Sequence, residues 1–380
     1  MLMSTFHRYI CVIGIALFSS IACSAPSTAE IPTNTSPPVQ ASDTPLPAAT
    51  NTPEPTPTHT SIPTITNTPE LTATFDPENP WSELTPLVEA RSEMPVAVLD
   101  GRLYISGGLA DRSISGVTSG YETLDSFEVY DPATNTWRTL PQLPEPRHHH
   151  MSVGYDGLIY VFGGLTAEIW TPSDNVWTFN PTTDTWAEKE PMLQASGAGA
   201  AVVLDEYIYI VGGEPDGQAL LRYHPASDSW TELSKMSERR EHTAAVALNG
   251  MIYVIGGRWQ VSGGLSGFID HISVEVYDPE TDTWTSAAST NRPHTGHAAV
   301  VLDERIYVFG GEVLTLFSTS NVVEYYDPGT DIWTLSPPMP ERLHGISAGV
   351  IGDIIYIPGG STKVGDAINS NALWMYQPNN

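Results

Sequence analysis

The chain has 380 residues, with 16 Lys and Arg against 44 Asp and Glu, which gives a formal net charge of −28 and a pI near 4.5. Nucleic-acid binding needs clustered positive charge, so this composition argues against a nucleic-acid partner. Both cysteines, Cys11 and Cys23, precede the aromatic-rich part of the chain, which therefore has no disulfide, thiolate metal ligand or cysteine nucleophile.

Residues 1–22 are predicted to be a signal peptide. A short segment ending in Arg8 precedes an apolar run over 9–18, which is too short to span a bilayer comfortably. Residues 21–24 resemble the end of a bacterial lipobox, although Ser20 stands where that family favours Leu. An ordinary signal peptide is the alternative. We expect a lipid on Cys23, which would be the chain's only contact with a membrane.

Residues 23–78 are predicted to form a disordered stalk, because Thr, Pro, Ser and Ala dominate and apolar side chains are few. Frequent proline stiffens such a segment toward polyproline II. Together with the signal peptide, the stalk predicts an extracytoplasmic protein, either lipid-anchored at the cell surface or secreted.

From residue 79 onward the sequence repeats with a period near fifty residues. Each repeat contains an apolar, alternating run that ends in two glycines, which is typical of a short buried strand. The glycine pairs are Gly107-Gly108, Gly163-Gly164, Gly212-Gly213, Gly256-Gly257, Gly310-Gly311 and Gly359-Gly360.

Downstream of five glycine pairs, an aromatic residue precedes a tryptophan by seven residues, with a proline-containing turn between them. This spacing suits two strands joined by a tight turn. The aromatic–tryptophan pairs are Tyr130 and Trp137, Phe179 and Trp186, Tyr223 and Trp230, Tyr277 and Trp284, and Tyr326 and Trp333.

This pattern of glycine pair, tyrosine and tryptophan resembles the kelch repeat. The resemblance implies an all-β fold over 79–380, a six-bladed propeller with four antiparallel strands per blade around a central channel. The sixth repeat ends near Tyr376 without a tryptophan, whereas Trp81 precedes the first complete repeat. We therefore expect the strand near Trp81 to close the ring as the outermost strand of the last blade.

Kelch propellers generally use one face for binding, and the resemblance places five arginines at or near the entry to that face. Arg91, Arg147 and Arg240 share one position relative to the glycine pairs, and Arg292 and Arg342 lie within two residues of it. Such a ring at the channel mouth would suit carboxylates or sugar acids. The alternative is that these arginines form salt bridges and carbonyl contacts between blades.

Several histidines, including His149, His242 and His297, fall in the same segments. Alternation along a strand would let only His148 and His150 share one side. We therefore assign no metal and no cofactor, and treat the histidines as structural or as binding residues.

Long loops at 109–124, 258–272 and 312–322 follow three of the glycine pairs and would overhang the same face. In the second of these loops, Trp259 is a candidate for stacking on a ligand. Covering the propeller is the alternative role for it.

The sequence favours a non-catalytic binding or adhesion module that recognises a glycan or a protein and is monomeric. Galactose oxidase has a similar propeller, but its copper centre needs a cysteine that this propeller lacks. The enzymatic alternative is a sugar-acid mutarotase similar to N-acetylneuraminate epimerase, for which no catalytic residue is assigned.

Overall fold

The computed structural model describes residues 79–111, 120–166, 171–264, 267–364 and 366–378. The predicted signal peptide, the stalk and Cys23 lie outside the described residues. Within the described part, no helix is both long and apolar enough to cross a membrane.

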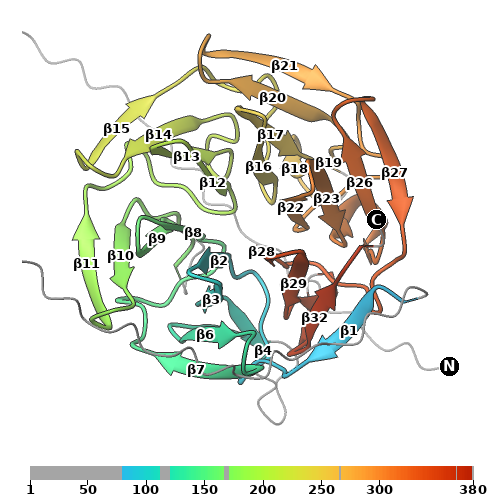
Figure 1. Cartoon of the computed structure of the whole chain (residues 1–380). Helices are drawn as coiled ribbons and strands as arrows, with labels where there is room; N and C mark the ends of the chain where they lie inside the picture. Colours follow the sequence, from blue (N-terminus) through green and yellow to red (C-terminus); the bar gives the residue numbers. More distant parts are fainter. Residues whose placement is uncertain (1–78, 112–119, 167–170, 265–266, 365, 379–380) are drawn as a thin grey trace, which may run out of the picture. The chain divides into compact units, whose positions relative to one another are not determined.

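Six four-stranded antiparallel sheets are arranged as the blades of a propeller (Figure 1). The innermost strands are β2 (Val96–Leu99), β8 (Met151–Tyr155), β12 (Ala200–Leu204), β16 (Ala244–Leu248), β22 (Ala298–Leu302) and β28 (Gly349–Ile351). Each innermost strand contacts those of both neighbouring blades, and β28 contacts β2, so the ring is closed. The predicted all-β, six-bladed fold is confirmed.

The second strands carry the apolar runs that end in the glycine pairs, and they are almost completely buried. They are β3 (Arg102–Ser106), β9 (Leu158–Phe162), β13 (Tyr207–Val211), β17 (Met251–Ile255), β23 (Arg305–Phe309) and β29 (Ile354–Pro358). The third strands are β6 (Phe127–Asp131), β10 (Val176–Asn180), β14 (Leu220–His224), β20 (Val274–Asp278), β26 (Val323–Asp327) and β32 (Leu373–Tyr376).

The outermost strands carry the tryptophans. They are β7 (Thr136–Leu140), β11 (Thr185–Lys189), β15 (Ser229–Glu232), β21 (Thr283–Ala287), β27 (Ile332–Ser336) and β1 (Trp81–Leu84). In every blade the indole N–H of this tryptophan donates to a backbone carbonyl that follows the outermost strand of the preceding blade, over 2.7 to 3.3 Å. The tryptophans thus join consecutive blades.

The N-terminal strand completes the last blade, as predicted. Strand β1 pairs with β32, with Trp81 opposite Tyr376, and the indole of Trp81 donates to the carbonyl of Pro337 after β27. Trp81 therefore has the role in blade 6 that Trp333 has in blade 5. Strand β1 therefore covers the edge of β32 and joins the first and last parts of the propeller in one sheet.

The apolar core lies between the blades. Six clusters of buried Leu, Ile, Val and aromatic side chains each draw on two adjacent blades, including the pair formed by blades 6 and 1. Burial of this area is the main stabilising contribution, and it is distributed around the whole ring.

Four blades carry an additional two-stranded hairpin between their second and third strands. The hairpins are β4 (Leu109–Asp111) with β5 (Tyr121–Thr123), β18 (Arg258–Gln260) with β19 (Phe268–Asp270), β24 (Glu312–Val313) with β25 (Ser318–Thr319), and β30 (Ser361–Lys363) with β31 (Asp366–Asn369). The 3₁₀ helix η2 (Leu314–Leu316) connects β24 to β25. Three of these hairpins lie in the predicted loops, and the fourth, in blade 6, was missed.

Candidate functional site

One residue from each blade forms a ring at the end of the channel where the innermost strands begin. We call these six residues the mouth ring, and all have left-handed backbone conformations with φ between 51° and 60°. They are Glu93, His149, Ala198, His242, Gly296 and Gly345. Five backbone N–H···O bonds of 2.7 to 2.9 Å join consecutive members, and Ile346 donates to Gly296 at 3.4 Å where the sixth would be.

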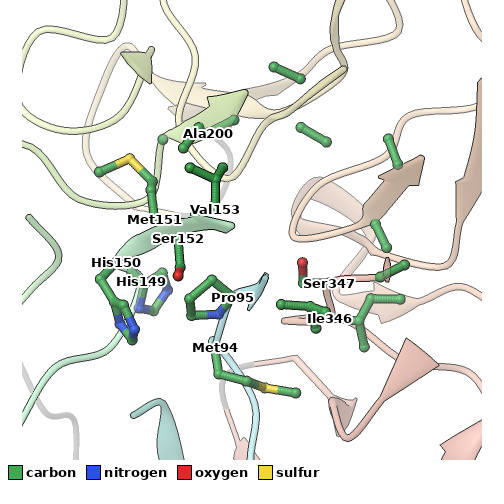
Figure 2. Close-up of a pocket in the computed structure, with 18 of the residues that line it drawn as sticks. Met94, Pro95, His149, His150, Met151, Ser152, Val153, Ala200, Ile346 and Ser347 are labelled. Atoms are coloured by element: carbon green, nitrogen blue, oxygen red, sulfur yellow. The ribbon is translucent and has the colours of Figure 1, made fainter. Parts of the chain in front are cut away.

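Behind the mouth ring, the channel forms a pocket of about 340 Å³. Small and apolar residues of the innermost strands line most of it (Figure 2, in which Pro95, Val153 and Ala200 are labelled). All six members of the mouth ring also line this pocket. The mouth ring therefore contributes the carboxylate of Glu93 and the imidazoles of His149 and His242 to the lining of the pocket.

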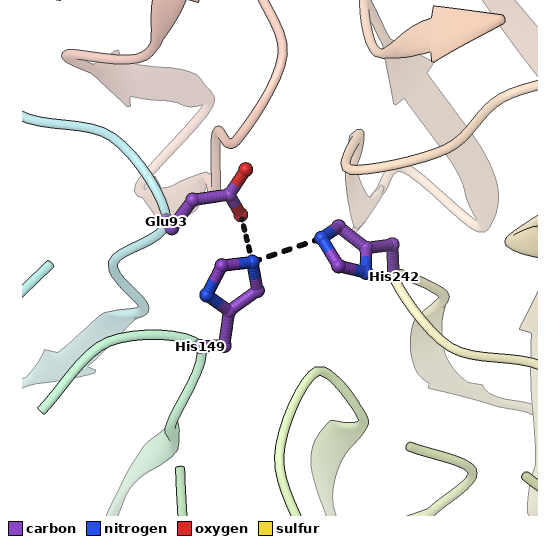
Figure 3. Close-up of side chains that lie close together, drawn as sticks. All are labelled: Glu93, His149 and His242. Carbon is purple, nitrogen blue, oxygen red and sulfur yellow. Dashed lines mark hydrogen bonds and ion pairs between the residues drawn. The ribbon is translucent and has the colours of Figure 1, made fainter. Parts of the chain in front are cut away.

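Three members of the mouth ring direct ionisable side chains toward one another (Figure 3). Nε2 of His149 lies 3.2 Å from Oε2 of Glu93 and 2.8 Å from Nε2 of His242. One donor atom from each residue lies within 4.8 Å of the other two. Blades 1, 2 and 4 thus supply two imidazoles and one carboxylate to a single point.

A second set of charged groups surrounds these three. Nδ1 of His242 is bonded to the carboxylate of Glu241, whose other oxygen accepts from Nε of Arg258 at 2.7 Å. Arg258 also pairs with Glu312 and lies 3.1 Å, through Nη2, from Nε2 of His242. On the other side, Nδ1 of His344 lies 3.5 Å from Oε1 of Glu93.

Burial and the neighbouring charges determine the protonation of these groups. Burial, the nearby guanidinium of Arg258 and the surrounding histidines keep the pKa of both His149 and His242 below the usual range, although Glu93 opposes this shift. Burial would also lower the pKa of His344, but its carboxylate neighbours Glu93 and Glu312 raise that pKa to about 8. These shifts favour the neutral form of the two imidazoles beside Glu93 and the cationic form of His344.

Of the predicted arginines, the three that share one repeat position have completely buried side chains. Arg91 donates to the carbonyl of Gly107 at 3.1 Å and to Glu128 at 2.6 Å, and Arg240 contacts the carbonyl of Gly256 and Glu275 in the same way.

Arg147 donates instead to Glu145 and Asn175. These three side chains therefore do not form the positive ring predicted at the channel mouth, because internal acceptors hold their guanidinium groups. A direct role for them in binding stays a prediction.

The remaining predicted site residues lie in different surroundings. Arg292 and Arg342 are exposed, and Arg342 donates to the carbonyl of Thr319 in the blade 5 hairpin. His297 is buried and lines the pocket. Trp259 lies on β18 and stacks with the guanidinium of Arg239, 5.4 Å from its ring centroid.

The alternation argument for the three consecutive histidines is wrong. It assumed an extended strand, but β8 begins only at Met151, and His149 has a left-handed backbone with φ of 53°. As a result, Nδ1 of His148 contacts Nδ1 of His149, while His150 bonds through Nε2 to the hydroxyl of Ser106.

Sequence reasoning found His149 and His242 and noted that Glu312, after a glycine pair, could reach the pocket, but it missed Glu93, Glu241 and Arg258. A signal was present, because Glu93, His149 and His242 occupy the same repeat position, two residues after the arginine position. Aligning the six repeats at every position, rather than following one residue type, would have grouped them. Arg258 and Glu312 share another repeat position, directly after the glycine pairs, and Glu241 lies directly before the mouth ring. The sequence does not indicate that these side chains pair with one another across blades.

The four hairpins form a continuous wall beside the mouth ring, which we call the hairpin wall. The carboxylate of Asp270 accepts from the backbone of Leu314 and Thr315 in blade 5. Thr319 donates to the carbonyl of Thr362 in blade 6, and Asn369 donates to that of Leu109 in blade 1. Blades 2 and 3 carry no such hairpin in the segments that the structure describes.

The hairpin wall exposes a concentration of large apolar side chains. They are Tyr121, Val261, Ile269, Ile272, Leu316, Phe317 and Ile368. The first residue of each hairpin forms a β-bridge with the residue that immediately precedes the mouth ring in the same blade. The wall and the mouth ring therefore belong to one face of the propeller.

Comparisons with known proteins agree with the fold. The family model described as "Attractin/LZTR1 beta-propeller" matches residues 103–334. The chain is similar to "Kelch-like protein terF" of Aspergillus terreus, with 26% identity over 253 residues, covering 66% of this chain and 44% of the relative. Similarity to "Kelch-like protein 26" of Danio rerio is 26% over 250 residues, covering 66% of this chain and 32% of the relative. The matches thus span less than half of these relatives.

Among solved structures, the one titled "Structure of YjhT" is similar, with a TM-score of 0.61 and 17% sequence identity. The match covers 76% of this chain and 95% of that structure. At this identity, the likeness shows the fold alone.

Proposed function

Because this chain belongs to the kelch-repeat β-propeller family, we propose that it is a non-catalytic binding module that docks a protein partner on the face formed by the hairpin wall. We further propose that the signal peptide exports it and that a lipid on Cys23 displays it outside the cytoplasm. The observation that carries the docking proposal is the group of exposed apolar side chains on the wall.

Exposed apolar side chains that are scattered singly need no functional explanation, but a concentration of them on one face does. Of the eleven large apolar side chains that are exposed in the described residues, seven lie in the four hairpin connections, and contacts between hairpins hold those connections together. A wall fixed in this way loses little conformational entropy when a partner binds. Aromatic and branched side chains on a fixed support are typical of the centre of a protein interface.

The test compares two double substitutions in blade 5. Leu316 and Phe317 on the wall are 73% and 58% exposed, and Ile332 and Leu335 on the outermost strand β27 are 56% and 58% exposed. The variants are Leu316→Ser with Phe317→Ser, and Ile332→Ser with Leu335→Ser as the matched control. Photo-crosslinking on intact host cells identifies the partner, and calorimetry with the purified partner measures the affinity.

The proposal predicts that the wall variant weakens binding at least about tenfold, since loss of about 1.4 kcal/mol at an interface has that effect. The control variant should bind like the wild type. Equal losses in both variants would contradict docking on the wall. If no protein partner is found and the chain binds selectively to sialylated or uronic-acid glycans on an array, the ligand is a glycan instead of a protein. That result would justify a mutarotase assay.

A further inference from the structure

The mouth ring contains a set of donor atoms that suits a metal ion. We propose that Glu93, His149 and His242 bind one divalent transition-metal ion of the zinc class, with an open coordination position facing the channel. This inference does not depend on the proposed protein partner. It rests on the convergence of the three side chains in Figure 3 and on the groups that orient them.

The distances fit a single ion after a small adjustment. Zinc lies about 2.0–2.2 Å from imidazole nitrogen and carboxylate oxygen, so two ligand atoms of a tetrahedral site are about 3.3 Å apart. The observed separations are 3.2 Å between His149 and Glu93 and 2.8 Å between His149 and His242. The third pair of ligand atoms, on Glu93 and His242, lies within 4.8 Å. To admit the ion, the two imidazoles would have to separate by about half an ångström, and Glu93 and His242 would have to approach each other by up to about 1.5 Å.

The hydrogen bonding around the two imidazoles favours a cation at this point. Glu241 accepts from Nδ1 of His242, which directs the lone pair of Nε2 toward His149. Nε2 of His149 faces that lone pair and also a carboxylate oxygen of Glu93. One hydrogen on Nε2 of His149 can serve only one of these acceptors, whereas a cation among the three atoms serves all of them.

The carboxylate of Glu241 has the role that second-layer carboxylates have in zinc sites. Histidine ligands usually donate their other ring N–H to a carboxylate, which fixes the tautomer and the ring orientation. Glu241 is itself held by Nε of Arg258 at 2.7 Å. Nη2 of Arg258 also lies 3.1 Å from Nε2 of His242. On binding, the ion would replace Nη2 of Arg258 as the partner of the Nε2 lone pair. Glu241 is therefore a positioning residue for His242.

The local charge is compatible with a divalent ion. Glu93, Glu241 and Glu312 provide three carboxylates, and the guanidinium of Arg258 pairs with the last two of them. Two nitrogen donors and one oxygen donor suit zinc and similar ions, whereas calcium and magnesium prefer oxygen ligands throughout. Three protein ligands and one open position are typical of accessible zinc sites rather than of closed structural ones.

The remaining members of the mouth ring leave room for this arrangement. A Cβ atom at Gly345 would lie 2.7 Å from Oε1 of Glu93, so glycine there allows Glu93 to occupy its position. Left-handed backbone favours glycine, yet Glu93, His149 and His242 adopt it with φ of 51° to 54°. Non-glycine residues held in such conformations cluster at functional sites.

The test uses the full chain, purified without a histidine tag and treated with a chelator. Calorimetric titration with Zn²⁺ alone measures stoichiometry and affinity, and the absorption spectrum with Co²⁺ reports nitrogen and oxygen coordination. The wild type should bind one ion per chain, and Zn²⁺ should raise its Tm. An excess of Ca²⁺ or Mg²⁺ should not displace the ion.

Four variants locate the site. His242→Ala and Glu93→Gln should weaken Zn²⁺ binding more than about hundredfold, and Glu241→Gln about tenfold to hundredfold. His297→Ala removes a histidine that lines the same pocket, so it should bind Zn²⁺ like the wild type. Glu93→Gln keeps the side-chain shape, which makes it informative even where His242→Ala disturbs folding. Absence of binding by the wild type, or equal binding by the wild type and Glu93→Gln, would overturn the proposal.

Discussion

The outermost strands and the mouth ring are built from the same six repeats, but they use the repetition in opposite ways. On the outside, one tryptophan per blade makes the same hydrogen bond to the preceding blade six times. At the channel mouth, the backbone repeats while the side chains change between glycine, alanine, histidine and glutamate. The difference teaches that side chains repeated in every blade stabilise the ring, whereas those that vary at a fixed backbone position are available for binding.

The largest expected effect separates two arginines that sequence analysis placed in one group. Arg240→Ala should lower the free energy of unfolding by about 3–5 kcal/mol, because it leaves the buried carboxylate of Glu275 without its guanidinium partner. Arg292→Ala removes an exposed side chain and should change that free energy by no more than about 0.5 kcal/mol. Urea unfolding of both variants makes the comparison, and a loss in Arg240→Ala as small as that in Arg292→Ala would refute a structural role for Arg240.

A smaller effect is expected where the ring closes. Trp81→Phe removes the indole hydrogen bond to Pro337 and part of the buried ring, which should cost about 1–2 kcal/mol. Trp333→Phe removes the equivalent bond to Ala288 and should cost about the same. Thermal unfolding compares the two. If Trp81→Phe leaves the Tm unchanged while Trp333→Phe lowers it, β1 contributes little to the closure of the ring.

Features that repeat along the sequence were predictable, whereas contacts that depend on the packed sheet were not. The glycine pairs recur in all six repeats and the aromatic–tryptophan spacing in five, so they predicted the blades, and the missing sixth tryptophan led to Trp81 as the closing residue. That the side chains of Arg91 and Arg240 point into the protein interior could not be predicted from the repeats. Their carboxylate partners, Glu128 and Glu275, lie on the third strands of their blades, and pairing with them depends on the packed sheet.

The smallest expected effect on global stability lies in the hairpin wall. Asp270→Ala removes the carboxylate that accepts from the backbone of Leu314 and Thr315 across two blades. Hydrogen exchange of the amides in 312–322 should become about tenfold faster, while the free energy of global unfolding changes by less than about 1 kcal/mol. Asp278→Ala, which removes a carboxylate from a turn in blade 4, is the control and should leave those amides unchanged.

The measurement that tests the contrast most directly is the free energy of unfolding, in urea with a chelator present, of the double variant His149→Ala with His242→Ala. Ala198 shows that alanine fits the backbone of the mouth ring, and water from the pocket can fill the space left by the imidazoles. We predict a value within about 1 kcal/mol of the wild type, against the loss of about 3–5 kcal/mol in Arg240→Ala. A loss in the double variant as large as that in Arg240→Ala would show that the mouth ring holds the fold together, and would contradict its assignment to binding.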